Sequence, residues 1–292
     1  DMAPGLVPNN VTGRIANRLD LMGPNYIIDA ACSASLLAVE AAMRELWSGR
    51  CDMMLTGGVH AATVQPIMML FCQLGALSRG DIRPFDAEAG GTILGGGAGI
   101  LVLKRLRDAE RDKNRIYAVL KGSGSSSDGK GLGLLAPRFE GECLALRRAY
   151  QGHEIDPQTV ELIEAHGTGI PLGDKTEIRS LTEIFGPRHQ SPQCAIGSVK
   201  SMISHCLTAA GAASLIKTAL ALHHKILPPT LCNQPHPALG LEQTPFYINN
   251  ETRPWIHGNA KIPRRAGRPI QISVVADKNV ELAKKVTGGA CR

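Results

Sequence analysis

Cys32 stands where two patterns in the sequence meet. The β-branched pair Ile27 and Ile28 precedes it, and the helical pattern that begins at Ser33 is apolar on nearly all of its faces. A thiol at the start of a helix meets backbone N–H groups and the positive end of the helix dipole, which favour the thiolate over the thiol. Position alone leaves two interpretations open: a nucleophile, or a small buried residue where Ala-rich backbone packs closely.

A nucleophilic cysteine needs partners, and two of the nine histidines have settings that favour chemistry. In EAHGTGIPLGD, His166 follows an apolar strand pattern, and the two glycines after it let the backbone pass close to a ligand. In GSVKSMISHCLTAAG, His205 follows a strand and a polar loop at the head of an Ala/Leu helix. Because α/β folds build sites at strand ends, both are candidates. We expect surface, loop or helix-end positions for the other seven, which are His60, His153, His189, His223, His224, His236 and His257.

Other motifs in the sequence lack essential parts. GGTILGGGAG has no Lys-Ser/Thr of a phosphate loop and ends in a strand pattern instead of opening a helix. GSGSSSDG is not the G-x-S-x-G turn of a serine hydrolase. The adjacent His205 and Cys206 lack further ligands at a spacing that suits a metal, so we expect no metal site.

Composition narrows the class of protein. A chain of 292 residues with 43% hydrophobic content can bury one large domain or two intimate halves. No apolar run reaches the roughly 20 residues of a membrane span, and Asp1 opens no signal segment, so we expect a cytoplasmic protein. The net charge of +6 comes from residues 259–292, which hold eight Lys/Arg against two Asp/Glu and no interleaved aromatics. Nucleic-acid binding is therefore not expected.

Short apolar runs alternate with longer helical patterns, which favours a layered α/β fold. The strands that we expect are residues 26–29, 52–56, 98–104, 117–121, 160–165 and 194–197. The helices that we expect are residues 33–47, 105–112, 138–151, 174–185 and 207–224. A break after KRLRDAERDK divides the core, so we expect three parts: residues 1–114 with the cysteine, 115–258 with both candidate histidines, and a basic tail over 259–292.

Three segments carry a resemblance to a known family by their order and separation. DAACSASL, EAHGTGIPLGDKTE and GSVKSMISH are similar to the three active-site segments of β-ketoacyl synthases, the condensing domains of polyketide and fatty acid synthases. GRIANRLDLMGPN, RPFDAEAGGTILGGGAGILVLKRL and LPPTL also resemble that family, so the likeness runs from Val11 to Gly267. The resemblance implies a thiolase-like layered fold of order α-β-α-β-α, incomplete in its first half.

The resemblance also implies a reaction. Cys32 would take an acyl chain from a phosphopantetheine thioester, and His166 and His205 would hydrogen-bond the carbonyl of a malonyl unit on acyl carrier protein as it loses carbon dioxide. The carbanion would then attack the Cys32 thioester and give a β-ketoacyl product. Beyond the substrates carried on phosphopantetheine, this chemistry needs no metal and no diffusible cofactor.

Further residues carry over by position. Lys200 and Glu177 would form a buried ion pair that orients the histidines, with Asp174 in the same segment; the alternative is exposed helix charges. Thr168 would hydrogen-bond the pantetheine arm, and the Cys32 N–H would supply part of an oxyanion hole. The resemblance implies a homodimer whose two-fold contact is formed by the strand at residues 26–28.

The sequence also departs from the family pattern. Ile170 stands where threonine is usual, and Met202 and Ser204 stand where asparagine and glycine are usual. The chain begins well inside the usual domain, and the glycine-rich loop expected after RRAG is absent. That loop normally supplies a second oxyanion donor, so we expect little condensing activity from this polypeptide alone. The alternative function is an inactive remnant that binds carrier protein or acts as a scaffold.

Overall fold

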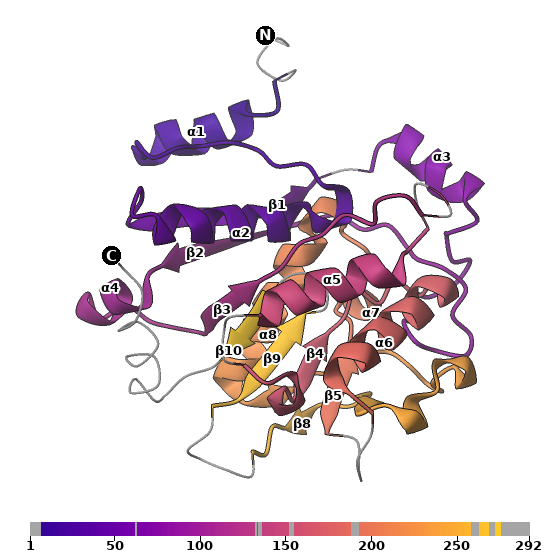
Figure 1. The fold of residues 1–292 in the computed structure, drawn as a ribbon. Coiled ribbons are helices and arrows are strands. Elements are labelled where there is room, and N and C mark those ends of the chain that lie inside the picture. Colours follow the sequence, from indigo (N-terminus) through magenta and orange to yellow (C-terminus); the bar gives the residue numbers. More distant parts are fainter. Residues whose placement is uncertain are drawn as a thin grey trace.

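The chain folds into alternating helices and strands stacked in layers (Figure 1). The computed structural model describes residues 7–61, 63–131, 133, 136–151, 155–187, 193–257, 263–268 and 272–275. Among these residues, none of the helices combines the length and the apolar character that crossing a bilayer requires.

A six-stranded sheet forms the centre of the second half. Its order is β3-β10-β9-β4-β5-β7, with bounds β3 Val119–Ser123, β10 Ile272–Val275, β9 Arg265–Arg268, β4 Leu162–Glu164, β5 Cys194–Gly197 and β7 Phe246–Ile248. The run from β9 to β7 is parallel, whereas β10 is antiparallel to both of its neighbours. Every residue of β4 and β5 is buried, as expected for central parallel strands covered on both faces.

Helices cover both faces of this sheet. On one face, α5 (Phe139–Tyr150) and α6 (Pro171–Phe185) pack against each other, and their apolar side chains share a core with Ile163. On the other face, α8 (Ala210–His224) shares a core with Leu162. Successive residues of β4 therefore serve opposite cores, which is the alternation of side chains that a strand requires.

A second layer system lies beyond α8. Helix α2 (Ala34–Trp47) packs beside α8, and the antiparallel pair β1 (Met53–His60) and β2 (Gly97–Lys104) lies on their far side. A Cβ on Gly58 would come within 2.6 Å of the Ser35 Cβ, so a glycine is needed where β1 crosses the start of α2. The order of layers is thus β-α-β-α, which is part of the predicted α-β-α-β-α order.

The remaining elements lie at the surface or in connections. They are α1 (Asn10–Leu19), α3 (Gln65–Gln73), α4 (Leu106–Arg111), α7 (Lys200–Ile203), β6 (Ile226–Leu227), β8 (Arg253–Pro254) and several 3-10 turns. Neither α1 nor α3 buries a residue, and the sequence analysis predicted neither.

The predicted strand at residues 26–29 is wrong. The structure assigns no strand there, and Tyr26 and Ile27 are 41% and 40% exposed. Isoleucine-rich segments become strands only when a neighbouring strand supplies ladder hydrogen bonds, and no described strand lies beside this one. In the basic segment 259–292, the described residues include β9 and β10 of the large sheet, and most of its other residues lie outside the described part.

Candidate active site

Cys32 lies on a short turn that leads into α2. Residues Ala31–Ser33 form a single 3-10 turn, and α2 follows at Ala34, one residue later than predicted. Ala31 has a φ of +49°, a left-handed conformation that costs a non-glycine residue about 1–2 kcal/mol. Its N–H donates to the Asp29 carboxylate at 3.0 Å, which helps to hold this turn. The half-buried thiol thus sits on a strained connection at the N-terminal end of the helix.

His205 is clamped through its main chain. Its N–H donates to the Ile93 carbonyl at 2.8 Å, and its carbonyl accepts from the Gly95 N–H at 3.0 Å. The residue before it, Ser204, has φ +65° and ψ −179°, a region that only glycine occupies without strain. The segment that precedes β2 therefore fixes the position of the His205 ring, which is 2% exposed.

The contacts of the His205 ring assign its tautomer. The Leu207 N–H donates to Nδ1 at 3.3 Å, so Nδ1 is an acceptor and the neutral ring carries its proton on Nε2. Nε2 lies 3.1 Å from the Cys32 Sγ, within hydrogen-bond reach. The ring can accordingly donate to a thiolate, or to the carbonyl oxygen of an acyl group carried on that sulfur.

His166 completes the group of three. It follows β4 by two residues, and its ring centroid lies 5.6 Å from that of His205, with the ring planes at 89°. The next residue, Gly167, has φ +40°, and a Cβ there would come within 2.7 Å of the Ser198 Cβ. The structure thus brings Cys32, His166 and His205 together from three distant segments.

Lys200 and Glu177 hold the main chain of His166. The buried Lys200 Nζ donates to the His166 carbonyl at 2.6 Å. The two Glu177 oxygens accept from the N–H groups of His166 at 2.6 Å and of Gly167 at 2.9 Å. Opposite charges therefore grip the backbone around His166, which orients the imidazole. The direct ion pair between Lys200 and Glu177 stays a prediction.

Asp174 ties the loop after His166 to a second loop. Its carboxylate accepts from the Thr168 N–H at 3.1 Å and from the Phe85 N–H at 2.8 Å. Burial, together with the charge of Glu177, raises the pKa of Asp174 to about 7, although backbone donors oppose the shift. Thr168 is buried beside these groups, and its role toward a pantetheine arm stays a prediction.

Three carboxyl and ammonium groups near the site were not predicted. Glu164 and Lys217 form an ion pair at 2.7 Å, next to the elements that carry His166 and Lys200. Glu142 of α5 accepts from the Ser180 hydroxyl, and burial raises its pKa to about 7. The one sequence signal for Glu164 was its place two residues before His166 in EAHGTG; the other two read as ordinary helix charges.

The other histidines lie away from this group. His60 contacts Thr63, and His223 and His224 stack on each other at the end of α8. His257 is not a surface histidine, because its ring is largely buried against the Glu161 carboxylate at 2.8 Å. His153 and His189 lie outside the described residues.

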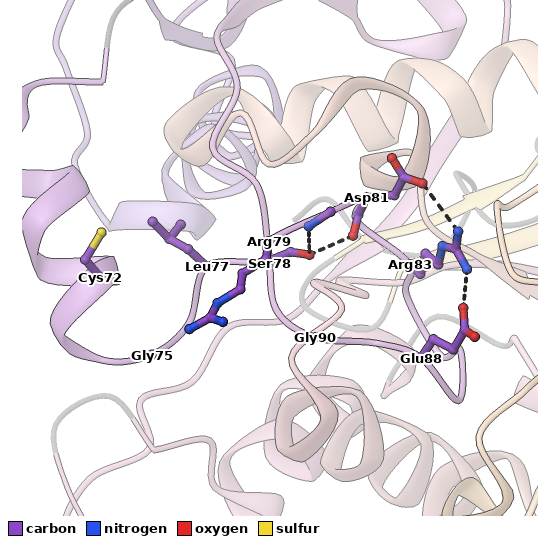
Figure 2. A pocket seen from close by; sticks show the side chains of 10 residues that line it. Cys72, Gly75, Leu77, Ser78, Arg79, Asp81, Arg83, Glu88 and Gly90 are labelled. Carbon is purple, nitrogen blue, oxygen red and sulfur yellow. Dashed lines mark hydrogen bonds and ion pairs between the residues drawn. The ribbon is translucent and has the colours of Figure 1, made fainter.

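A large pocket of about 820 Å³ lies beside the site instead of within it (Figure 2). Its lining comes entirely from residues 72–90, so Cys32 and both histidines are absent from it. Figure 2 shows Arg83 between two carboxylates, with Nη1 2.6 Å from Glu88 and Nη2 3.4 Å from Asp81. The same segment continues to Gly91, whose N–H donates to the Gly169 carbonyl at 2.9 Å. The pocket therefore borders the loop that follows His166.

Comparisons with known proteins place this geometry in a family. The family model "Beta-ketoacyl synthase, N-terminal domain" matches residues 2–109, and "Beta-ketoacyl synthase, C-terminal domain" matches residues 117–233. One relative, from the polyunsaturated fatty acid synthase of Thraustochytrium sp., is 41% identical over 275 residues, which are 91% of this chain and 10% of that protein. Polyketide synthase PksN of Bacillus subtilis is 40% identical over 278 residues, 91% of this chain and 5% of that protein.

Solved structures agree. The ketosynthase from module 6 of the bacillaene synthase of Bacillus subtilis 168 superposes with a TM-score of 0.90 at 37% identity, over 95% of this chain and 52% of that chain. The oxazolomycin ketosynthase domain OzmH KS7 of Streptomyces albus superposes with a TM-score of 0.87 at 30% identity, over 94% of this chain and 51% of that one. The chain thus spans about half the length of these ketosynthases. The predicted thiolase-like α/β fold is confirmed, and the chain belongs to the β-ketoacyl synthase family.

Proposed function

We propose that this chain carries the condensing site of a β-ketoacyl synthase, an acyltransferase that extends an acyl chain by decarboxylative Claisen condensation. The observation that carries the proposal is the 3.1 Å contact between the His205 Nε2 and the Cys32 Sγ, with the His166 ring beside them. One thiol and two imidazoles on a common centre suit a nucleophile with two hydrogen-bond donors.

The first step is acyl transfer. The Cys32 thiolate attacks the carbonyl carbon of an acyl thioester, and the tetrahedral intermediate collapses with loss of the donor thiolate, which takes up a proton. The backbone N–H of Cys32 at the start of α2 serves as one donor to the oxyanion. The product is an acyl group held covalently on Cys32.

The second and third steps are decarboxylation and condensation. A malonyl thioester binds with its carbonyl oxygen facing His166 and His205, and its C–CO₂ bond breaks with release of carbon dioxide. The electron pair left behind forms an enolate, whose oxygen accepts hydrogen bonds from both imidazoles. The enolate carbon then attacks the Cys32 thioester, and the C–S bond breaks to release the β-ketoacyl product and regenerate the thiolate.

The substrates are proposed to arrive on the phosphopantetheine arm of an acyl carrier protein, with the Thr168 hydroxyl as a contact of the arm. The reaction requires no metal and no diffusible cofactor. A homodimer and a cytoplasmic location are part of the same proposal. The names of the relatives, a polyunsaturated fatty acid synthase and polyketide synthases, support a substrate class of growing acyl or polyketide chains.

The test separates the partial reactions. The purified chain is incubated with an acyl thioester and then with a malonyl thioester, each on carrier protein, and mass spectrometry follows the acylated peptide and the β-ketoacyl product. Cys32→Ala removes the acyl adduct, whereas the exposed Cys72→Ala, a matched control, retains it. Acylation at another cysteine overturns the nucleophile. Carrier binding without acylation of Cys32 favours the alternative of a scaffold.

A further inference from the structure

The ion pair between Glu164 and Lys217 joins three elements that surround the candidate site. Glu164 is the last residue of β4, Lys217 lies on α8, and their charged atoms are 2.7 Å apart. The Glu164 side chain is 2% exposed and that of Lys217 is 15% exposed. An ion pair so far from water is difficult to explain by stability alone, since buried pairs gain little over apolar residues of similar size.

The second oxygen of Glu164 has a separate task. Oε1 accepts from the Val199 N–H at 2.6 Å, and Val199 is the residue that caps the start of α7. The first residue of α7 is Lys200, whose Nζ holds the His166 carbonyl at 2.6 Å. One carboxylate therefore connects the strand that carries His166 to the short helix that carries Lys200. Lys217 supplies the countercharge that keeps this carboxylate in place.

His205 does not depend on this connection. It follows α7 in the chain, but its main chain is fixed on both sides by Ile93 and Gly95. A change in the position of α7 should therefore displace Lys200 from the His166 carbonyl while leaving His205 beside Cys32. The two partial reactions separate on this point, because His205 and Cys32 meet in acyl transfer whereas His166 and Lys200 serve the malonyl carbonyl.

We propose that Glu164 and Lys217 are positioning residues for decarboxylation: the pair sets the place of α7, and through Lys200 the orientation of His166. The inference rests on the proposed function. It assigns neither residue a contact with substrate.

The experiment compares the parent chain with Glu164→Gln, Lys217→Met and the double variant. Glutamine keeps an acceptor for the Val199 N–H, and methionine keeps most of the length of lysine. Each single variant leaves one buried charge without its partner, so we expect both to lower the urea midpoint. The double variant removes both charges, so its midpoint should return close to that of the parent. Glu161→Gln is the matched control, because Glu161 lies at the other end of the same strand and contacts Trp255 and His257.

The readouts are carbon dioxide release from a malonyl-pantetheine thioester and acylation of Cys32 by an acetyl-pantetheine thioester. For the double variant we expect kcat of decarboxylation to fall about 10-fold to 100-fold, since small misplacements of a catalytic group have effects of this size. KM and the acylation rate should stay within about 3-fold of the parent, because ground-state binding and the Cys32–His205 contact are not altered. A parental kcat in the double variant, or equal losses in both partial reactions, overturns the proposal.

A third readout is independent of the proposed function. Hydrogen exchange of the peptide over residues 198–206 should be at least about 10-fold faster in the double variant than in the parent, because α7 loses its charged anchor. Glu161→Gln should leave this exchange unchanged. If the parent releases no carbon dioxide, the proposed function fails, and unchanged exchange in the double variant still overturns the positioning role.

Discussion

The two sides of the candidate site are built differently. His166 and Lys200 belong to a sheet whose central strands are buried on both faces, and both are held by charged side chains. Cys32 belongs to the first half, where α1 and α3 bury no residue and apolar side chains of the hairpin such as Ile100 and Val102 are exposed. The histidine side is therefore determined by many interactions, and the cysteine side by few.

What places Cys32 is its contact with the second half. The Ser35 hydroxyl accepts from the Ala212 N–H at 3.0 Å, which joins the start of α2 to the start of α8. Leu36 of α2 is fully buried in the same core as Leu215 of α8. The position of the nucleophile thus depends on helix packing across the two halves, and His205 lies at that junction.

Removal of His205 is expected to have the largest effect. His205→Ala takes away the group next to the Cys32 sulfur, and a positioned acid–base group typically contributes about 10²-fold to 10⁴-fold in rate. Acylation of Cys32 by an acyl-pantetheine thioester, followed by mass spectrometry, measures the loss. His224→Ala, an exposed histidine at the end of α8, is the control. Parental acylation in His205→Ala would show that the cysteine side works without its partner.

Core truncation should distinguish the two halves next. Leu215→Ala removes a side chain that is 1% exposed, and we expect a loss of about 2–5 kcal/mol in the free energy of unfolding. Ile15→Ala on α1 removes one that is 41% exposed, and its effect should stay within about 0.5 kcal/mol. Urea denaturation of both variants measures the difference. Equal losses would contradict the contrast in burial between the halves.

The second half also carries a buried carboxyl group whose titration costs stability. The pKa of Glu142 is raised to about 7 from its ordinary 4.5, mainly by burial. The folded state therefore holds this proton longer than the unfolded state, so its contribution to stability is full below pH 4.5 and is lost as the pH rises to 7. Glu142→Gln removes this titration.

Between pH 5 and pH 8, the parent should therefore lose about 2 kcal/mol more stability than Glu142→Gln. Urea denaturation at both pH values provides the measurement. Asp174, whose pKa is also raised to about 7, titrates in both proteins and cancels in the comparison. Parallel pH curves would show that Glu142 is not buried from water as the structure has it.

Much of this architecture was predictable from local patterns. The strand predicted at 194–197 matches β5, and the helices predicted at 138–151 and 207–224 match α5 and α8 within a few residues. These elements have strong apolar periodicity and clear breaks at Gly, Pro or charged residues. The helices α1 and α3 were missed because their apolar residues lie beside glycine or in a short run, where the helical pattern is weak.

The parts that failed depend on contacts between distant segments. The strand predicted at 26–29 had the right residue types, but a strand also needs a partner, and local sequence does not report one. The Glu164–Lys217 pair was invisible for the same reason: Lys217 sits in an apolar helix pattern, where its charge has no meaning until β4 lies beside it. The three catalytic candidates were found because family motifs encode spatial partners that periodicity does not.

The smallest expected effect is the relief of backbone strain on each side of the site. Ser204, next to His205, has φ +65° and ψ −179°, which costs about 1–3 kcal/mol for a residue with a Cβ. Ser204→Gly removes that cost but adds about 0.5–1 kcal/mol of backbone entropy to the unfolded chain, so we expect a net gain of about 1 kcal/mol. The space agrees, because the Ser204 Cβ would lie only 3.0 Å from a Cβ on Gly95. Ala31, next to Cys32, has the milder φ of +49°, and Ala31→Gly should gain about 0.5 kcal/mol or less. Urea denaturation of both variants ranks the two strains, and a larger gain at Ala31 would mean that the cysteine side stores more strain than the histidine side.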